Sequence, residues 1–224
     1  MPEPRDVIII GGLGDGTVVA AAMDDAARRG DFPWRVAGYL NDRLEPGSDL
    51  EGHPVLGRLD DLPRFLARDY HFLYTIYRID GQDLRLARFD SLGLPEARLA
   101  TVVHPSAYVA GQVELGPGCV IMPHACLSPG TRLGPGCLVM AGATVGHNDV
   151  LGRCCHIAAQ ACLGAYLTVG QGVHVGLNAT VRENLTLGDR STLGMGAVLL
   201  NDMGPDEIWA GVPARLLRHA RKEL

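Results

Sequence analysis

The sequence has few aromatic residues, little net charge and no long apolar run, and each absence excludes a class of protein. Phe, Trp and Tyr make up 5% of the 224 residues, and the formal net charge is -5. Because Lys and Arg are scattered and outnumbered by acidic residues, we expect no nucleic-acid partner. The apolar run at 7–10 is far too short to span a bilayer and follows a polar segment. We therefore expect no secretory signal, no membrane partner and a cytoplasmic protein.

Glycine, in contrast, is abundant, and many of the glycines recur at a fixed position of a six-residue repeat. The position after each repeated aliphatic residue is usually Gly, and the fifth position of the hexad is mostly small. Neither the period of two of a strand nor the period of 3.6 of a helix produces such spacing. The aliphatic residues recur without an insertion over seventeen hexads: Val103, Val109, Leu115, Ile121, Leu127, Leu133, Val139, Val145, Leu151, Ile157, Leu163, Val169, Val175, Val181, Leu187, Leu193 and Leu199.

Hexapeptide repeats are typical of a parallel β-helix. In that architecture three hexads form one triangular coil, and each coil pairs in parallel with the next. The repeat predicts such a domain over residues 101–210. Cys119, Cys137 and Cys155 occupy the same small position in successive coils, which predicts a column of buried thiols. The six cysteines lack CxxC spacing, so no metal is expected.

Residues 1–100 have a different pattern, in which short apolar strands alternate with helices. We predict strands at 6–10, 36–40, 54–56 and 72–76, and helices at 17–29, 60–67 and 82–91. Such alternation is typical of a small parallel α/β sheet. The glycine loop GGLGDG at 11–16 joins the first strand to the first helix, where a diphosphate can approach the helix N-terminus. Half of a dinucleotide fold favours a single nucleotide diphosphate over NAD.

Several motifs, in this order along the chain, resemble one family. They are GGLGDG at 11–16, AGYLND at 37–42, VHPSA at 103–107, GHN at 146–148, the turn around His156 and GVPA at 211–214. The whole chain resembles the hexapeptide-repeat sugar O- and N-acetyltransferases of the sialic acid and bacillosamine pathways. The resemblance implies a Rossmann-like half-domain, a left-handed β-helix and a homotrimer with active sites between subunits. It also implies a nucleotide-linked amino sugar as partner, held by Gly12, Leu13, Gly14, Asn41 and Asp42.

Acyl transfer from a thioester to an amine requires a base beside the acceptor, and histidine titrates in the right range. His147 lies near a corner of its hexad, where a side chain points out of the prism. The resemblance identifies His147 as the catalytic base and places His156 at the acyl site. Family members usually have an acidic residue after this base, whereas this chain has Asn148. Either Asn148 or Asp149 is expected to orient the ring.

Acetyl-CoA is the cosubstrate that the resemblance implies, without a metal. Its predicted contacts are Ala165, His174, Gly194, Gly196, Gly211, Pro213 and Arg215. Direct transfer without an acetyl-enzyme is expected, because the cysteines lie at core or unassisted positions. In the last segment, 211–224, Leu216 and Leu217 stand among basic residues, which predicts a short amphipathic helix that caps the open end of the β-helix.

Two segments depart from the family. Asp15 stands where the family loop often has histidine, and it brings negative charge close to the expected diphosphate. The residues Thr-Ile-Tyr-Arg at 75–78 replace a motif of small Gly and Asn residues. These departures leave the nucleotide base and the sugar open.

The sequence predicts an acetyl-CoA-dependent N-acetyltransferase that acts on the amino group of a nucleotide-linked amino sugar in surface glycan biosynthesis. O-acetylation of a sugar or a sialic acid is an alternative, and a non-catalytic nucleotide-sugar-binding scaffold is another. A zinc site like that of γ-class carbonic anhydrases is disfavoured. It needs two histidines close in sequence and a third two coils away, which His147, His156 and His174 do not provide.

Overall fold

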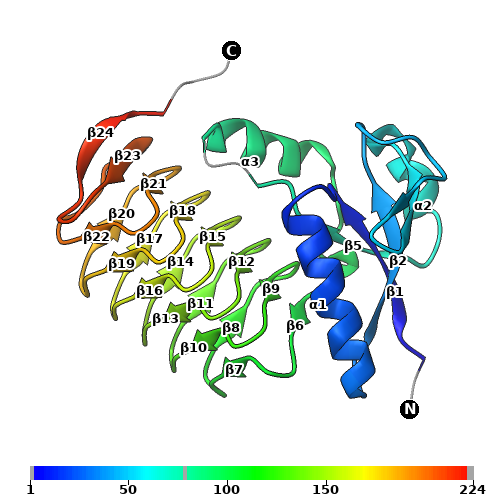
Figure 1. The fold of residues 1–224 in the computed structure, drawn as a ribbon, viewed down its shortest axis with the longest axis horizontal. Helices are drawn as coiled ribbons and strands as arrows, with labels where there is room; N and C mark the ends of the chain where they lie inside the picture. The colour runs from blue at the N-terminus through cyan, green and yellow to red at the C-terminus, as the bar shows by residue number, and fades with distance from the viewer. Residues whose placement is uncertain (1–2, 78–79, 221–224) are drawn as a thin grey trace.

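The computed structural model describes residues 3–77 and 80–220, which form two regions side by side (Figure 1). An α/β region lies on the right of the view, and a left-handed β-helix of stacked parallel coils lies on the left. The predicted fold class, a Rossmann-like half-domain followed by a β-helix, is confirmed. Only the C-terminal element of that prediction differs.

The α/β region contains every strand and helix that the sequence predicts for it. All neighbouring strands of its sheet are parallel except β3 and β4. None of the helices in the described part of the chain is long and apolar enough to cross a membrane. The strands, in the order β3-β4-β2-β1-β5 across the sheet, are β1 (Arg5–Ile10), β2 (Trp34–Leu40), β3 (Asp49–Leu50), β4 (His53–Gly57) and β5 (His71–Tyr74). The helices are α1 (Asp15–Arg29), η1 (Leu59–Asp61), α2 (Leu62–Leu66), α3 (Gln82–Ser91) and η2 (Glu96–Arg98).

Strand β1 occupies an inner position because it is apolar on both faces. Val7, Ile8, Ile9 and Ile10 are all fully buried, as in a parallel sheet that is covered on both sides. The chain passes from β1 to β2 on one side and later returns to β5 on the other side of β1. A parallel sheet binds ligands at the carboxyl ends of its strands where the chain switches direction in this way.

Each predicted hexad forms one short strand that ends on the predicted aliphatic residue. Every third strand belongs to the same sheet, and residues one coil apart pair in parallel, as Cys126 does with Thr144. The strands are β6 (Val102–Val103), β7 (Tyr108–Val109), β8 (Glu114–Leu115), β9 (Val120–Ile121), β10 (Cys126–Leu127), β11 (Arg132–Leu133), β12 (Leu138–Val139), β13 (Thr144–Val145), β14 (Val150–Leu151), β15 (His156–Ile157), β16 (Cys162–Leu163), β17 (Thr168–Val169), β18 (His174–Val175), β19 (Thr180–Val181), β20 (Thr186–Leu187), β21 (Thr192–Leu193) and β22 (Val198–Leu199).

The interior of the β-helix consists of the aliphatic and small positions of the hexads. Cys119, Cys137 and Cys155 form the predicted buried column, and their thiols donate to backbone carbonyl oxygens at 3.1–3.2 Å. Glycine is required at the corners for a steric reason. A Cβ atom at Gly146 would overlap the carbonyl oxygen of Gly164 in the next coil. Successive coils therefore approach too closely for a side chain at this position.

A β-ribbon, not a helix, closes the C-terminal end. Strand β23 (Glu207–Ala210) pairs with β21, and β24 (Arg215–His219) pairs antiparallel with β23. The helix predicted for 211–224 is therefore wrong over the described residues, and 221–224 lie outside them. The backbone groups on the outer edge of β23 need partners, which β24 supplies. Leu216 and Leu217 remain 45% and 65% exposed, so no buried apolar stripe stabilises a helix here.

The α/β region packs on the face of the β-helix that contains β9, β12, β15 and β18. One apolar cluster joins Val7 and Trp34 of the α/β sheet to Val102, Val120 and Leu138 of the β-helix. This packing places the carboxyl ends of the α/β strands close to β15 and β18.

Candidate active site

A cavity of about 1020 Å³ lies at the carboxyl ends of β1, β2 and β5. The loops after these three strands line it together with one side of α3. It contains all five residues predicted to hold a nucleotide, namely Gly12, Leu13, Gly14, Asn41 and Asp42. The remaining lining residues are Gly11, Asp15, Arg43, Leu59, Tyr74, Thr75, Ile76, Tyr77, Leu84, Arg85, Ala87, Arg88 and Ser91.

The glycine loop of this cavity is held in shape by Asn41. The Nδ2 group of Asn41 donates to the carbonyl oxygen of Gly11 at 2.7 Å, and Oδ1 accepts from the backbone N–H of Arg43 at 2.8 Å. Gly12 has a φ of +134°, and a Cβ there would lie 2.9 Å from the Leu50 side chain. The loop thus depends on glycine and leads directly into the positive N-terminal end of α1, which suits a diphosphate.

Three arginines line the cavity, Arg85 and Arg88 from α3 and Arg43 from the loop after β2, against two carboxylates, Asp15 and Asp42. Asp42 interacts with the rim rather than with the glycine loop. Its Oδ1 accepts from the backbone N–H of Leu59 at 2.9 Å, and its Oδ2 lies 3.9 Å from Nη2 of Arg88. Three guanidinium groups beside a helix N-terminus favour an anionic ligand.

A second cavity, of about 310 Å³, lies on the β-helix beneath the α/β region. Asp15 and Tyr77 line both cavities, so the two meet at these residues. Three of the predicted site residues, His156, His174 and Gly194, line the second cavity. Its other lining residues are mostly apolar or small: Met140, Ala158, Ala159, Gly176, Leu177, Thr192, Leu193 and Met195.

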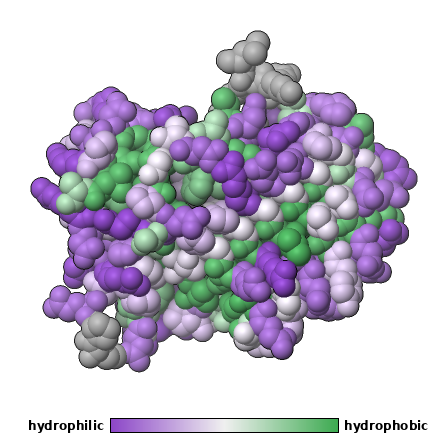
Figure 2. All heavy atoms as spheres, turned by 180° about the vertical axis from the view of Figure 1, so that it is seen from behind, coloured by the Kyte–Doolittle hydropathy of each residue, from purple (hydrophilic) through white to green (hydrophobic). Residues whose placement is uncertain are grey.

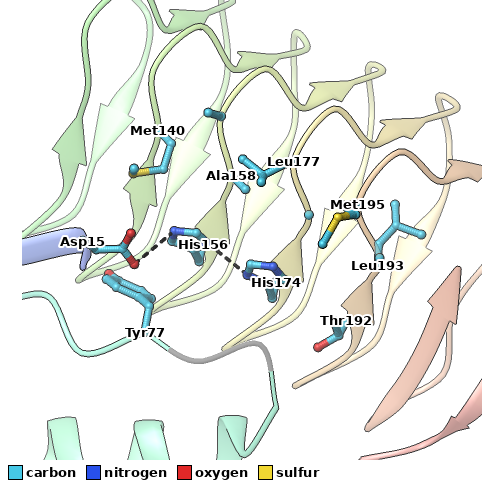
Figure 3. A pocket seen from close by; sticks show the side chains of 13 residues that line it. Asp15, Tyr77, Met140, His156, Ala158, His174, Leu177, Thr192, Leu193 and Met195 are labelled. Atoms are coloured by element: carbon cyan, nitrogen blue, oxygen red, sulfur yellow. Dashed lines mark hydrogen bonds and ion pairs between the residues drawn. The ribbon is translucent and has the colours of Figure 1, made fainter. Parts of the chain in front are cut away.

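His156 and His174 form a stacked pair in this cavity (Figure 3). They stand at paired positions of β15 and β18, so the register of the β-helix itself brings them together. Their rings are 4.9 Å apart and nearly parallel, and the two Nδ1 atoms are 2.9 Å apart. One Nδ1 must therefore donate to the other. On the opposite side, Nε2 of His156 lies 3.6 Å from Oδ2 of Asp15.

Burial sets the protonation of these groups. Desolvation, together with the nearby charge of Arg85, lowers the pKa of His174 to about 4. Desolvation first, and then the proximity of His174 and Arg85, lowers the pKa of His156 well below its usual value. Both rings are neutral near pH 7. Burial also raises the pKa of Asp15, while Arg85 acts in the opposite direction.

Arg85 and Tyr77 extend the histidine stack into the α/β region. The guanidinium of Arg85 lies 4.8 Å from the Tyr77 ring, which in turn lies 4.8 Å from the His156 ring. Arg85 donates from Nη2 to the carbonyl oxygen of Gly172, and the Tyr77 hydroxyl donates to Gly136. Both hydrogen bonds cross between the two regions, so the stack fixes the position of His156.

His147 and Asn148 lie elsewhere, exposed at a corner after β13, and line neither cavity. Nδ1 of His147 is 3.3 Å from Oδ1 of Asn148, and its ring contacts the Tyr166 ring at 4.9 Å. Asp149, the alternative partner, is fully buried and accepts from the backbone N–H of Leu167 at 2.8 Å. Burial raises the pKa of Asp149 to about 7. The contact seen for His147 is therefore with Asn148.

The remaining residues predicted to contact acetyl-CoA line neither cavity of the single chain. These are Ala165, Gly196, Gly211, Pro213 and Arg215. Ala165 follows the corner of β16, and Gly196 follows β21. Gly211 and Pro213 form the turn between β23 and β24, and Arg215 begins β24.

Sequence reasoning missed the roles of Asp15, Tyr77 and Arg85. Asp15 and Tyr77 fall on the two departures from the family, which was the available signal, although Arg78 of the second departure lies outside the described residues. Arg85 had no local signal, because an arginine in a polar helix is ordinarily exposed. Among the described residues no group of three or more His, Cys, Asp or Glu side chains could hold a metal ion.

Comparisons with solved structures identify similar proteins over nearly the whole chain. The acetyltransferase domain of PglB from Neisseria gonorrhoeae, in complex with acetyl coenzyme A, is 28% identical with a TM-score of 0.82, covering 96% of this chain and 100% of that one. PerB from Caulobacter crescentus, in complex with CoA and GDP-perosamine, is 27% identical with a TM-score of 0.81, covering 95% and 97%. WeeI from Acinetobacter baumannii, at 21% identity and a TM-score of 0.68, shares the fold. No family model and no curated protein matches the sequence.

The fold, the paired cavities and these similarities define an acyltransferase with a hexapeptide-repeat β-helix. These similarities support the hexapeptide-repeat sugar acetyltransferase family that the motifs predicted.

Proposed function

We propose that this protein is an acetyl-CoA-dependent N-acetyltransferase that modifies the amino group of a nucleotide-linked amino sugar in surface glycan biosynthesis. The observation that carries the proposal is the junction of the two cavities at Asp15 and Tyr77. A nucleotide diphosphate at the glycine loop would direct its sugar through this junction toward His156. The acceptor group would then lie on the face of the β-helix.

The comparisons support the choice of both substrates. One similar structure holds acetyl coenzyme A, and another holds CoA together with GDP-perosamine and is a perosamine N-acetyltransferase. The glycine loop, the three arginines and the N-terminus of α1 suit a nucleotide diphosphate in the larger cavity. The smaller cavity, with Leu177, Leu193 and Met195 in its lining, suits an acetyl group and the end of a pantetheine chain.

The proposal includes a homotrimer in which a neighbouring subunit completes each site. His147 is exposed at one corner of the prism, whereas the two cavities lie on the face that the α/β region covers. Seen from behind, the β-helix has bands of apolar surface between polar ones, in the right half of Figure 2. Exposed apolar side chains of the β-helix include Tyr108, Val150, Tyr166, Leu177 and Met195. Packing subunits on such surface would bury it and bring His147 to a neighbour's cavity.

In this arrangement His147 carries one proton from the acceptor amine to the departing sulfur. Acetyl-CoA supplies an acyl thioester. With Nδ1–H donated to Asn148, the Nε2 lone pair of His147 accepts the proton that the amine loses as its nitrogen bonds to the acyl carbon. His147 then returns this proton to the sulfur that departs. The neutral pair of His156 and His174 fixes the position of the acceptor without competing for the proton.

The deciding experiment is a thiol-release assay with acetyl-CoA. The acceptors are UDP-, GDP- and dTDP-linked amino sugars, their hydroxyl counterparts, free sugars and sialic acids, with products identified by mass spectrometry. We expect thiol release and a single N-acetyl product with a nucleotide-linked amino sugar. O-acetylation of a free sugar or sialic acid would replace the proposal with the first alternative. Tight binding of a nucleotide sugar without any transfer would indicate the scaffold.

A further inference from the structure

Asp15 is the one carboxylate that lines both cavities, and the proposed function does not yet use it. Building on that proposed function, we propose that Asp15, held in place by His156, binds the acceptor's amino group in its ammonium form as it arrives and so selects an amine over a hydroxyl group; the extra proton leaves to solvent before His147 acts on the neutral amine. From the sequence alone, Asp15 was expected to place a negative charge close to the diphosphate. The structure shows the carboxylate directed toward His156 instead (Figure 3).

The geometry leaves the Asp15 carboxylate, and not Nε2 of His156, accessible to a ligand. Oδ2 of Asp15 and Nε2 of His156 are 3.6 Å apart, which is longer than a good hydrogen bond. Nε2 of His156 is buried and has no hydrogen-bond partner among the described residues. A nitrogen atom in the cavity can lie about 3 Å from an Asp15 oxygen, because that side chain is 28% exposed, whereas the covered Nε2 is out of its reach.

The hydrogen bond between the two histidines can run in either direction, and both directions lead to the same requirement for a ligand at Asp15. If His156 donates from Nδ1 to His174, its Nε2 is an acceptor that faces a second acceptor, the Asp15 carboxylate. A cation bound to the carboxylate offsets the repulsion between these two acceptors. If His174 donates instead, the N–H at Nε2 of His156 faces Asp15, and the carboxylate still presents its remaining lone pairs to the cavity. In both arrangements an ammonium group donates to the Asp15 carboxylate and neutralises its charge, whereas a hydroxyl group has one donor and no charge.

The charge balance points in the same direction. Within the described part of the chain, no Lys or Arg forms an ion pair with Asp15, because the nearby Arg85 donates to the backbone at Gly172. Burial raises the pKa of Asp15 and Arg85 acts against this only at a distance, so a cation in direct contact would further stabilise the ionised carboxylate. Asp15 is the first residue of α1, where the helix dipole favours the ionised carboxylate. An amino sugar carries such a cation at neutral pH.

Binding measured without acetyl-CoA tests the inference apart from catalysis. Isothermal titration of the assembled protein would compare the nucleotide-linked amino sugar with its hydroxyl counterpart on the same nucleotide. We expect the wild type to bind the amino sugar at least tenfold more tightly. Asp15→Asn should lose most of that preference while binding the hydroxyl counterpart within threefold. Asp15→Glu, which keeps the charge, should retain part of it, and Asp60→Asn, which removes an exposed charge outside both cavities, should retain all of it.

The outcomes separate the inference from the proposed function. If the amino sugar binds and is acetylated, but Asp15→Asn keeps the preference or weakens both ligands equally, the inference alone is wrong. If no nucleotide-linked amino sugar binds the wild type, both are wrong. Unchanged thermal unfolding and unchanged affinity for the free nucleoside diphosphate would show that Asp15→Asn is folded. Loss of the preference for the amino sugar in folded Asp15→Asn, with that preference kept in Asp60→Asn, supports the ammonium site.

Discussion

The β-helix and the α/β region reach their structures by different routes. In the β-helix each hexad repeats one local solution, so residues that share a face, such as His156 and His174, stand at a fixed sequence separation. In the α/β region the site is assembled from loops that follow β1, β2 and β5, which are distant in sequence. Chemical groups on the β-helix are therefore rigidly spaced, whereas those on the α/β region depend on loop conformation.

This difference suggests a division of work in the site. In the function proposed above, the β-helix supplies His147 for the transfer and His156 for positioning, while the α/β region recognises the nucleotide and, through Asp15, the acceptor. Substitutions on the two regions should accordingly affect different kinetic constants. Four predictions test that separation, beginning with the largest effect.

Replacing His147 with Ala should lower kcat by about 10²- to 10⁴-fold, because the proposed general base is lost. Acetyl-CoA affinity should stay nearly unchanged, since His147 is expected to act on the acceptor's proton. His124→Ala is the matched control, because His124 is also an exposed corner histidine of the β-helix and lines neither cavity. Steady-state kinetics showing His147→Ala within threefold of the wild type would remove His147 from the mechanism.

Replacing Gly12 with Val should raise the acceptor KM by about 10- to 100-fold, with kcat within about threefold. The new side chain would meet Leu50 and impose strain at a φ of +134°, which distorts the nucleotide loop but not the β-helix. Gly111→Ala serves as the control, because a Cβ there meets no atom within 4 Å. A fall in kcat as large as the rise in KM would contradict the separation between the regions.

Asp149 offers a test of stability within the β-helix. Its pKa is about 7 in the folded protein and near 3.8 in the unfolded chain, so between these values only the folded state holds the proton. The free energy of unfolding should therefore fall as pH rises through this interval, because unfolding releases this proton, and level off above about pH 7, where the folded state loses it too. Asp149→Asn should remove this dependence and raise stability at pH 8 by about 1–3 kcal/mol.

Thermal or urea unfolding of wild type and Asp149→Asn at pH 5 and pH 8 measures this effect. A stability difference between the two proteins that is the same at both pH values would show that Asp149 does not hold a proton in the folded β-helix.

The smallest expected effect is that of Asn148→Asp. A carboxylate next to His147 would stabilise the protonated ring, so the acidic limb of the kcat/KM profile should move to higher pH by up to about one unit. The gain in rate should appear above that limb, where the ring is again neutral. Profiles for wild type and Asn148→Asp on one acceptor provide the measurement. An unmoved limb would mean that Asn148 does not orient the base in the assembled enzyme.

The two regions also differ in how far the sequence reveals them. The hexads place every strand of the β-helix, and the alternation of strands and helices gives the α/β elements within a few residues. The C-terminal segment was misread, because Leu216 and Leu217 among basic residues resemble a helix stripe. The unpaired edge of β23, which favours a strand there, is a property of the folded sheet and has no local signature.

The sequence by itself determined the β-helix, the α/β half-domain and five loop residues of the larger cavity, namely Gly12, Leu13, Gly14, Asn41 and Asp42, since these follow from periodicity or from short contiguous motifs. Only the tertiary structure decided that Asp15 and Tyr77 join two cavities, that Arg85 is buried beneath them and that His156 pairs with His174 facing Asp15. The physical reason is that these contacts depend on how one region docks on the other. Docking is fixed by apolar packing between Val7, Trp34 and the face around Leu138, which no single segment of the sequence encodes.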